Sequence, residues 1–114
     1  MKKLNKIMLA LSILPTLLTS VFLFFMNDTV PMHYNASGAV DRYGSKYENF
    51  ILPAIILFMY AFYMVYTKIY TKYSTNSVEK INNNVKITAI LVTSIIAAFN
   101  ILQLMFLILA ILKP

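Results

Sequence analysis

The chain has 114 residues, of which 60% are hydrophobic and only 12% are charged, and its mean hydropathy is +0.71. Soluble domains average about 45–50% apolar and about 25% charged residues, so this composition excludes an ordinary water-soluble globule. The lack of cysteine excludes a disulfide scaffold, a cysteine-ligated metal centre and a cysteine nucleophile. The composition therefore indicates a single integral membrane domain over residues 1–114.

Hydropathy resolves three apolar segments, at about residues 7–26, 50–70 and 87–112. A helix needs roughly 20 apolar residues to cross a hydrocarbon core of about 30 Å, and all three segments are long enough. Because lipid cannot hydrogen-bond the backbone, spanning segments of this kind must be helical. The sequence thus predicts an all-α, multi-pass membrane protein with three transmembrane helices. Residues 27–49 and 71–86 connect them.

The basic residues predict the orientation of these helices. Two basic residues lie in the first connection and Lys113 lies at the carboxyl end, whereas seven lysines lie at the amino end or around the second connection: Lys2, Lys3, Lys6, Lys68, Lys72, Lys80 and Lys86. Loops rich in Lys and Arg stay in the cytoplasm, so the N-terminus and residues 71–86 are expected to be cytoplasmic and residues 27–49 external. The net charge of +6 is then a topology signal, and we expect no nucleic-acid partner.

Polar residues inside the predicted spans fall on defined faces. Ser12, Thr16 and Ser20 recur every four residues and share one face of the first helix, near Pro15, which removes a backbone donor and is expected to bend the helix. Asn100 and Gln103 lie three residues apart in the third span, and they need partners because unpaired amides are costly in hydrocarbon. We favour helix–helix contacts for both groups. For Asn100 and Gln103 a ligand or gating contact is the alternative.

The connection over residues 27–49 contains both glycines, the single histidine and three of the four acidic residues. Val30 to Tyr34 is typical of an extended stretch, and Asn35 to Gly38 is typical of a turn. Gly44 offers a second reversal before the next helix. We therefore expect an ordered external cap, with a hairpin as one form of it.

Three interpretations of this loop remain open. His33, Asp41 and Glu48 are weak candidates for a metal site, but no spacing matches an established metal motif, so no metal and no cofactor are expected. A structural network would have Asn35 and Asp41 bonding turn amides and His33 bonding a backbone carbonyl. Direct ligand contact would use side chains suited to peptide or headgroup recognition: His33, Tyr34, Arg42, Tyr43 and Lys46. We expect no enzymatic activity.

The loop resembles the amino-terminal domain of the SdpI family of bacterial toxin-immunity membrane proteins, a domain of unknown function. The resemblance rests on a spaced motif between the first and second apolar segments: Pro31, His33, Asn35, Gly38, Asp41, Gly44, Ser45 and Lys46. It covers roughly residues 1–70, and the third span loosely. The family's named member is about twice as long, with six predicted spans, so its second half has no counterpart in these 114 residues.

The resemblance implies a protein of the bacterial cytoplasmic membrane that protects its producer by binding a secreted antimicrobial peptide at the outer membrane face. A signalling role is not assumed, because only three spans are predicted here. A small accessory subunit of a larger membrane transporter or sensor complex is the alternative. The expected partners are the lipid bilayer and a secreted peptide toxin, while a homo-oligomer or a larger membrane partner stays open.

Overall fold

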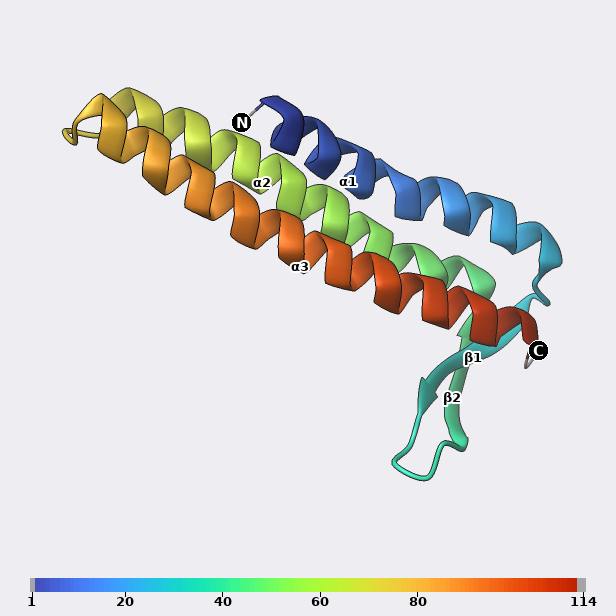
Figure 1. The fold of residues 1–114 in the computed structure, drawn as a ribbon. Helices are drawn as coiled ribbons and strands as arrows, with labels where there is room; N and C mark the ends of the chain where they lie inside the picture. Colours follow the sequence, from blue (N-terminus) through green and yellow to red (C-terminus); the bar gives the residue numbers. More distant parts are fainter. Residues whose placement is uncertain (1, 113–114) are drawn as a thin grey trace.

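The computed structural model describes residues 2–112 (Figure 1), so Lys113 lies outside the described residues. Three long helices lie side by side, and a hairpin projects from one end of them. In chain order the elements are α1 (Lys2–Phe22), the 3₁₀ turn η1 (Leu23–Phe25), β1 (Thr29–Tyr34), β2 (Val40–Ser45), the 3₁₀ turn η2 (Lys46–Phe50), α2 (Ile51–Tyr73) and α3 (Val78–Leu112).

All three helices are long and apolar enough to cross a membrane, as the sequence predicts. The expectation of an all-α fold is incomplete, because β1 and β2 form a two-stranded antiparallel sheet. The helices extend beyond the apolar segments predicted from hydropathy. α1 starts at Lys2, α2 continues to Tyr73, and α3 starts at Val78 instead of Ile87.

The early start of α3 shortens the second connection from the predicted 71–86 to 74–77. Ser77 begins the helix, because its Oγ accepts a hydrogen bond from the Lys80 backbone N–H at 3.2 Å. Glu79 in the first turn adds a favourable charge at the positive end of the helix dipole. Hydropathy cannot detect residues 78–86, because they are helical but mostly polar. At 35 residues, α3 is roughly 52 Å long, which exceeds a hydrocarbon core of about 30 Å.

The helices pack around two clusters of buried side chains. One joins all three helices through Met8, Ile56, Tyr63, Ala89 and Ile96. The other lies at the hairpin end of the bundle, where Met26 and Val30 pack against Leu107 and Ala110 of α3. Val30 belongs to β1 and is fully buried. The second cluster therefore attaches the hairpin to the helices.

Pro15 lies inside α1 without ending it. A proline has no N–H, so the carbonyl four residues earlier, that of Leu11, lacks its α-helical donor. Asn100 of α3 supplies one, since its Nδ2 donates to the Leu11 carbonyl at 2.9 Å and to its own Ile96 carbonyl at 2.8 Å. The amide of α3 thus replaces the hydrogen bond that Pro15 removes from α1.

A proline and a side-chain amide of α3 are related in the same way at the start of α2. Pro53 leaves the carbonyl of Asn49 without its donor from four residues later. The buried Gln103 donates through Nε2 to this carbonyl at 2.8 Å and to the Thr19 Oγ1 at 2.9 Å. Asn100 and Gln103, three residues apart on α3, therefore bond α1 and α2, which is the helix–helix contact favoured from the sequence.

The hydroxyl stripe of α1 behaves differently from its prediction. The hydroxyl of the buried Ser12 bonds the Met8 carbonyl at 2.7 Å, and that of the exposed Ser20 bonds the Thr16 carbonyl at 2.8 Å, so both bonds stay within α1. The Thr16 hydroxyl is buried without a hydrogen-bond partner. The hydroxyl that bonds another helix belongs to Thr19, outside the predicted stripe.

We expect Asn100→Leu to destabilise the protein by about 1 kcal/mol, in the range of hydrogen bonds between membrane helices, because it leaves the Leu11 carbonyl without a donor. Adding Pro15→Ala should recover most of the loss, because an alanine at this position supplies the missing N–H. Equilibrium unfolding in mixed micelles measures this double-mutant cycle. Asn100→Leu with Pro53→Ala is the matched control and should be additive. If the changes in unfolding free energy are additive both with Pro15→Ala and with Pro53→Ala, Asn100 does not compensate for Pro15.

Candidate functional site

The hairpin turn is organised by the side chain of Asn35. Its Oδ1 accepts three hydrogen bonds, from the Ser37 backbone N–H at 3.0 Å, the Ser37 hydroxyl at 2.7 Å and the Ala39 N–H at 3.0 Å. The backbone closes the same turn, because the Asn35 N–H donates to the Ala39 carbonyl at 2.8 Å. Gly38 has φ +83°, a conformation that glycine adopts without steric cost. The turn predicted at these residues is therefore present.

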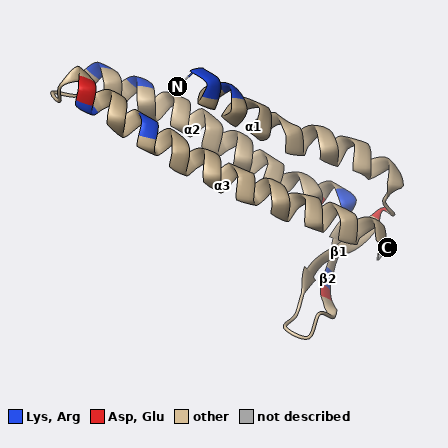
Figure 2. Cartoon of the chain, in the orientation of Figure 1, with Lys and Arg blue, Asp and Glu red and all other residues tan. Residues whose placement is uncertain are grey.

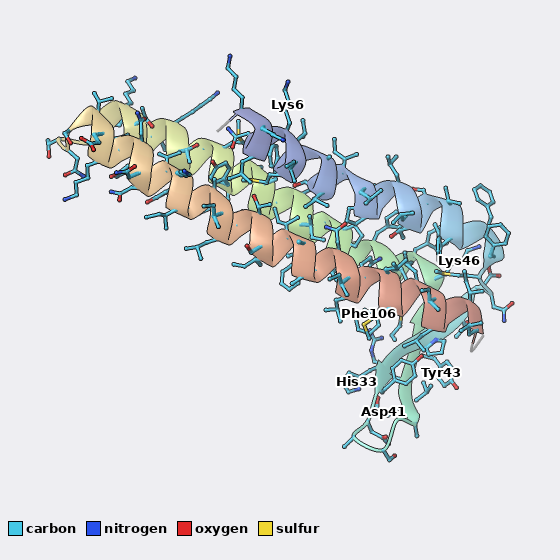
Figure 3. All side chains as sticks on the ribbon, in the orientation of Figure 1. Lys6, His33, Asp41, Tyr43, Lys46 and Phe106 are labelled. Carbon is cyan, nitrogen blue, oxygen red and sulfur yellow. The ribbon has the colours of Figure 1, made fainter. Side chains whose placement is uncertain are left out.

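His33 and Asp41 contact each other across the two strands of the hairpin. Nδ1 of His33 lies 2.6 Å from Oδ1 of Asp41, and the two side chains are 67% and 43% exposed. The network predicted for these residues is wrong in its partners: His33 bonds a carboxylate instead of a backbone carbonyl, and Asp41 bonds His33 instead of a turn amide. This cross-strand pair lies toward the far end of the hairpin (Figure 3).

Gly44 does not form the predicted second reversal. It lies within β2, opposite Val30, and the chain leaves the strand through η2. A side chain at Gly44 would overlap the carboxylate of Glu48 and approach Met32. Because Gly44 has no side chain, the carboxylate of Glu48 in η2 can lie against the strand at this position.

The base of the hairpin is closed by Ser45 and Lys46. The Lys46 N–H donates to the Asp28 carbonyl at 2.9 Å, and the Ser45 Oγ accepts from the Tyr47 N–H at 3.3 Å. The Lys46 side chain, only 19% exposed, lies 3.5 Å from the Asp28 carboxylate and against the Tyr47 ring. Pro31, also buried, pairs with Tyr43 in the sheet.

Arg42 and Glu48 form the second charged pair, with Nη2 of Arg42 donating to Oε1 of Glu48 at 3.0 Å. Glu48 is therefore held by Arg42, apart from the pair of His33 with Asp41. In the described part of the chain no three His, Asp or Glu side chains gather in a group that could hold a metal ion. The three weak metal candidates are thus not brought together.

A pocket of about 220 Å³ lies where the hairpin meets the helices. The pair of Arg42 and Glu48 contributes its charged part, and Gln103 and Asn49 contribute amides. The remaining lining is apolar and comes from β1, α2 and α3: Pro31, Met32, Ile51, Leu52 and Phe106. The combination of an apolar wall with a charged pair suits an amphipathic ligand, because each part of the ligand finds a matching surface.

The predicted contact residues are placed differently around this pocket. Arg42 lines it, while Tyr43 is 57% exposed on β2 and labelled beside the strand in Figure 3. Tyr34 is half-buried and pairs with Val40 in the sheet. His33 lies outside the pocket lining, and so does Lys46.

Five residues of the pocket lining were missed from the sequence: Met32, Asn49, Ile51, Leu52 and Phe106. They contribute to the lining together with the predicted Gln103. For Asn49 a signal was available, because it precedes Pro53 by four residues and so offers a free carbonyl. Phe106 had none, because one aromatic residue in an apolar span does not reveal which way it faces.

Residues 10–57 match a domain of unknown function, DUF1648. The matched segment runs from α1 through the hairpin into the first turns of α2. An uncharacterized protein of Archaeoglobus fulgidus is 42% identical over 67 residues, which are 59% of this chain and 35% of the relative. The chain thus spans about a third of that relative's length. No solved structure gives a significant match.

We expect Asn35→Ala to loosen the hairpin, because the turn loses an oxygen that accepts three hydrogen bonds. A loss of about 1 kcal/mol should raise the rate of tryptic cleavage after Arg42 roughly fivefold, since cleavage follows the population of the open hairpin. Limited proteolysis in detergent measures it. Asn35→Asp keeps the acceptor oxygen and should cleave like wild type. Equal rates for all three proteins would contradict this role of Asn35.

Proposed function

We propose that this protein is an immunity protein of a bacterial cytoplasmic membrane, which binds a secreted antimicrobial peptide at the outer membrane face. The observation that carries the proposal is the amphipathic pocket under the hairpin, with its apolar wall and its pair of Arg42 and Glu48. The resemblance of the loop motif to the SdpI family supports the same class of ligand. The match to DUF1648 covers β1, β2 and η2, which contribute to the pocket.

The proposal requires the hairpin to lie outside the cell, and the charge distribution supports this orientation. The hairpin end holds Arg42 and Lys46, each paired with a carboxylate. Seven lysines and the single acid Glu79 lie on α1 and around the α2–α3 turn, toward the opposite end (Figure 2). The positive-inside rule assigns that end to the cytoplasm.

The proposed mechanism follows from where the pocket lies. Its apolar wall comes from β1, the start of α2 and Phe106 of α3, and its charged pair lies on β2 and η2. In the proposed orientation this is the end of the helices that faces the outer membrane surface. A membrane-active peptide is already concentrated in the bilayer, so it can reach the wall by lateral diffusion. Its polar groups would meet Arg42 and Glu48. Capture at this depth would keep the peptide from inserting further.

The accessory-subunit alternative was motivated by intramembrane polar residues that could have partners outside this chain. Asn100 and Gln103 bond α1 and the start of α2 within this chain. Ser12 and Ser20 bond carbonyls of their own helix. Four of the five polar residues behind this alternative therefore bond within the chain, whereas the Thr16 hydroxyl is buried without a hydrogen-bond partner.

The orientation is tested by cysteine labelling, because the native chain has no cysteine. Ser37→Cys on the hairpin turn should react in intact cells with a membrane-impermeant thiol reagent, whereas Ser77→Cys in the α2–α3 connection should react only after lysis. Mass shift on gels measures both. The reverse pattern would place the pocket in the cytoplasm and overturn the proposed function.

The function is tested by survival of a sensitive bacterial host that expresses the chain and is challenged with a panel of secreted membrane-active peptides. Wild type should protect against a peptide in this class. Glu48→Gln should reduce protection roughly tenfold, as expected when a hydrogen bond to a charged group is weakened, and Leu52→Trp should abolish it by filling the pocket.

Asp28→Asn is the matched control, because Asp28 is an exposed acid at the same end that does not line the pocket. It should protect like wild type when membrane levels are equal. Protection by wild type that survives both pocket substitutions would remove the pocket from the mechanism. No protection by wild type against any peptide would overturn the immunity proposal.

A further inference from the structure

A second polar cleft lies at the end of the molecule opposite the hairpin. α1 begins at Lys2 beside the middle of α2, since the Tyr63 hydroxyl donates to the Asn5 Oδ1 at 3.2 Å. α2 and α3 continue beyond this point, as Figure 1 shows. The cleft where α1 begins holds about 490 Å³, within the range of roughly 300–1,000 Å³ that is usual for small-ligand sites.

The lining of this cleft comes from all three helices. Lys68 and Lys72 are one turn apart on α2 and so share a face. The polar lining is completed by two amides and two hydroxyls, those of Asn5, Asn82, Thr67 and Thr71. No carboxylate lines the cleft, and over residues 2–112 none forms an ion pair with Lys68 or Lys72. The cleft therefore combines uncompensated positive charge with neutral hydrogen-bonding groups.

The cleft also lies at the depth of lipid headgroups. α1 has 21 residues and is about 32 Å long, so it crosses a hydrocarbon core of about 30 Å with little excess. Its first turns, which carry Lys2, Lys3 and Lys6 (Figure 3 labels Lys6), therefore mark one membrane boundary. Asn5 belongs to the same turns and lines the cleft. Phosphate groups of that leaflet lie at this level.

We propose that this cleft binds the phosphate ester of an anionic phospholipid headgroup, with Lys68 and Lys72 neutralising the charge and Asn5 and Asn82 donating hydrogen bonds. Apolar side chains support a lipid in preference to a soluble phosphate, because Met64 and Val85 also line the cleft.

The test measures retained lipid by native mass spectrometry, on the full chain in an uncharged detergent with either phosphatidylglycerol or phosphatidylcholine added. Wild type should retain phosphatidylglycerol preferentially. Lys68→Gln with Lys72→Gln should weaken its binding roughly 25-fold, the product of about fivefold for each lysine at an anionic surface. Lys68→Arg with Lys72→Arg should retain it, and this variant also shows that altered side chains at these positions allow folding.

Lys2→Gln with Lys3→Gln is the matched control, because it removes the same charge from the same end without touching the cleft lining. It should retain most of the binding. An equal loss in both Gln variants would show diffuse attraction to anionic lipid and overturn the site, and so would equal retention of phosphatidylcholine by wild type. Competition by glycerol 3-phosphate at concentrations equal to the lipid would overturn the lipid as the source of the phosphate.

This inference is independent of the proposed function, because the cleft and the hairpin pocket share no residue. A protein that protects without retaining lipid, or that retains lipid without protecting, would separate the two proposals.

Discussion

The arrangement of the three helices depends on how two proline-freed carbonyls are satisfied. Lipid offers no hydrogen bonds, so a carbonyl that loses its helical donor within the membrane must find another inside the protein. Asn100 and Gln103 bond the two carbonyls that Pro15 and Pro53 leave free. Because these amides lie three residues apart on one helix, they fix the position of α3 against α1 and the start of α2 together. Hydrophobic packing alone would allow α3 to slide, since lipid is as apolar as its side chains.

This pairing also shapes the candidate site. The hydrogen bond from Gln103 to Asn49 holds η2 against α3, and η2 carries Glu48 into its contact with Arg42. Gly44 leaves the space that the Glu48 carboxylate occupies. A two-stranded hairpin is marginally stable by itself, and here it is held by Val30 in the cluster with Leu107. The motif residues thus build the support, while the pocket lining comes largely from residues outside the motif.

The two ends of the molecule offer different chemistry. At the hairpin end both described basic residues pair with a carboxylate, Arg42 with Glu48 and Lys46 with Asp28, and His33 bonds Asp41. At the other end the lysines greatly outnumber the single acid Glu79. Paired charges suit selective contacts with a ligand, because little net field remains. Unpaired lysines favour an anionic surface, and the basic cleft gives that attraction a defined location.

The sequence by itself determined the number and class of the long elements, because about 20 consecutive apolar residues have one stable form in a membrane. It also located the turn at Asn35 to Gly38, because the propensities that govern turns are local. It located the apolar part of α3 but gave no sign of the helical residues 78–86, since these are mostly polar and hydropathy detects only apolar segments. It also assigned Gly44 to a turn, whereas Gly44 lies in β2 against the Glu48 carboxylate. Glycine is suited both to turns and to positions where another group lies close to the backbone, so the residue type alone does not distinguish them.

Only the tertiary structure decided which partners the polar groups take. The amides at 100 and 103 were recognised as needing partners, but the identity of those partners depended on the register of α3 against two other helices. Neither the pocket under the hairpin nor the basic cleft is a local feature, since each is lined from three or more elements of the chain. Contacts of this kind are set by packing geometry between distant segments, which a pattern along one chain does not encode.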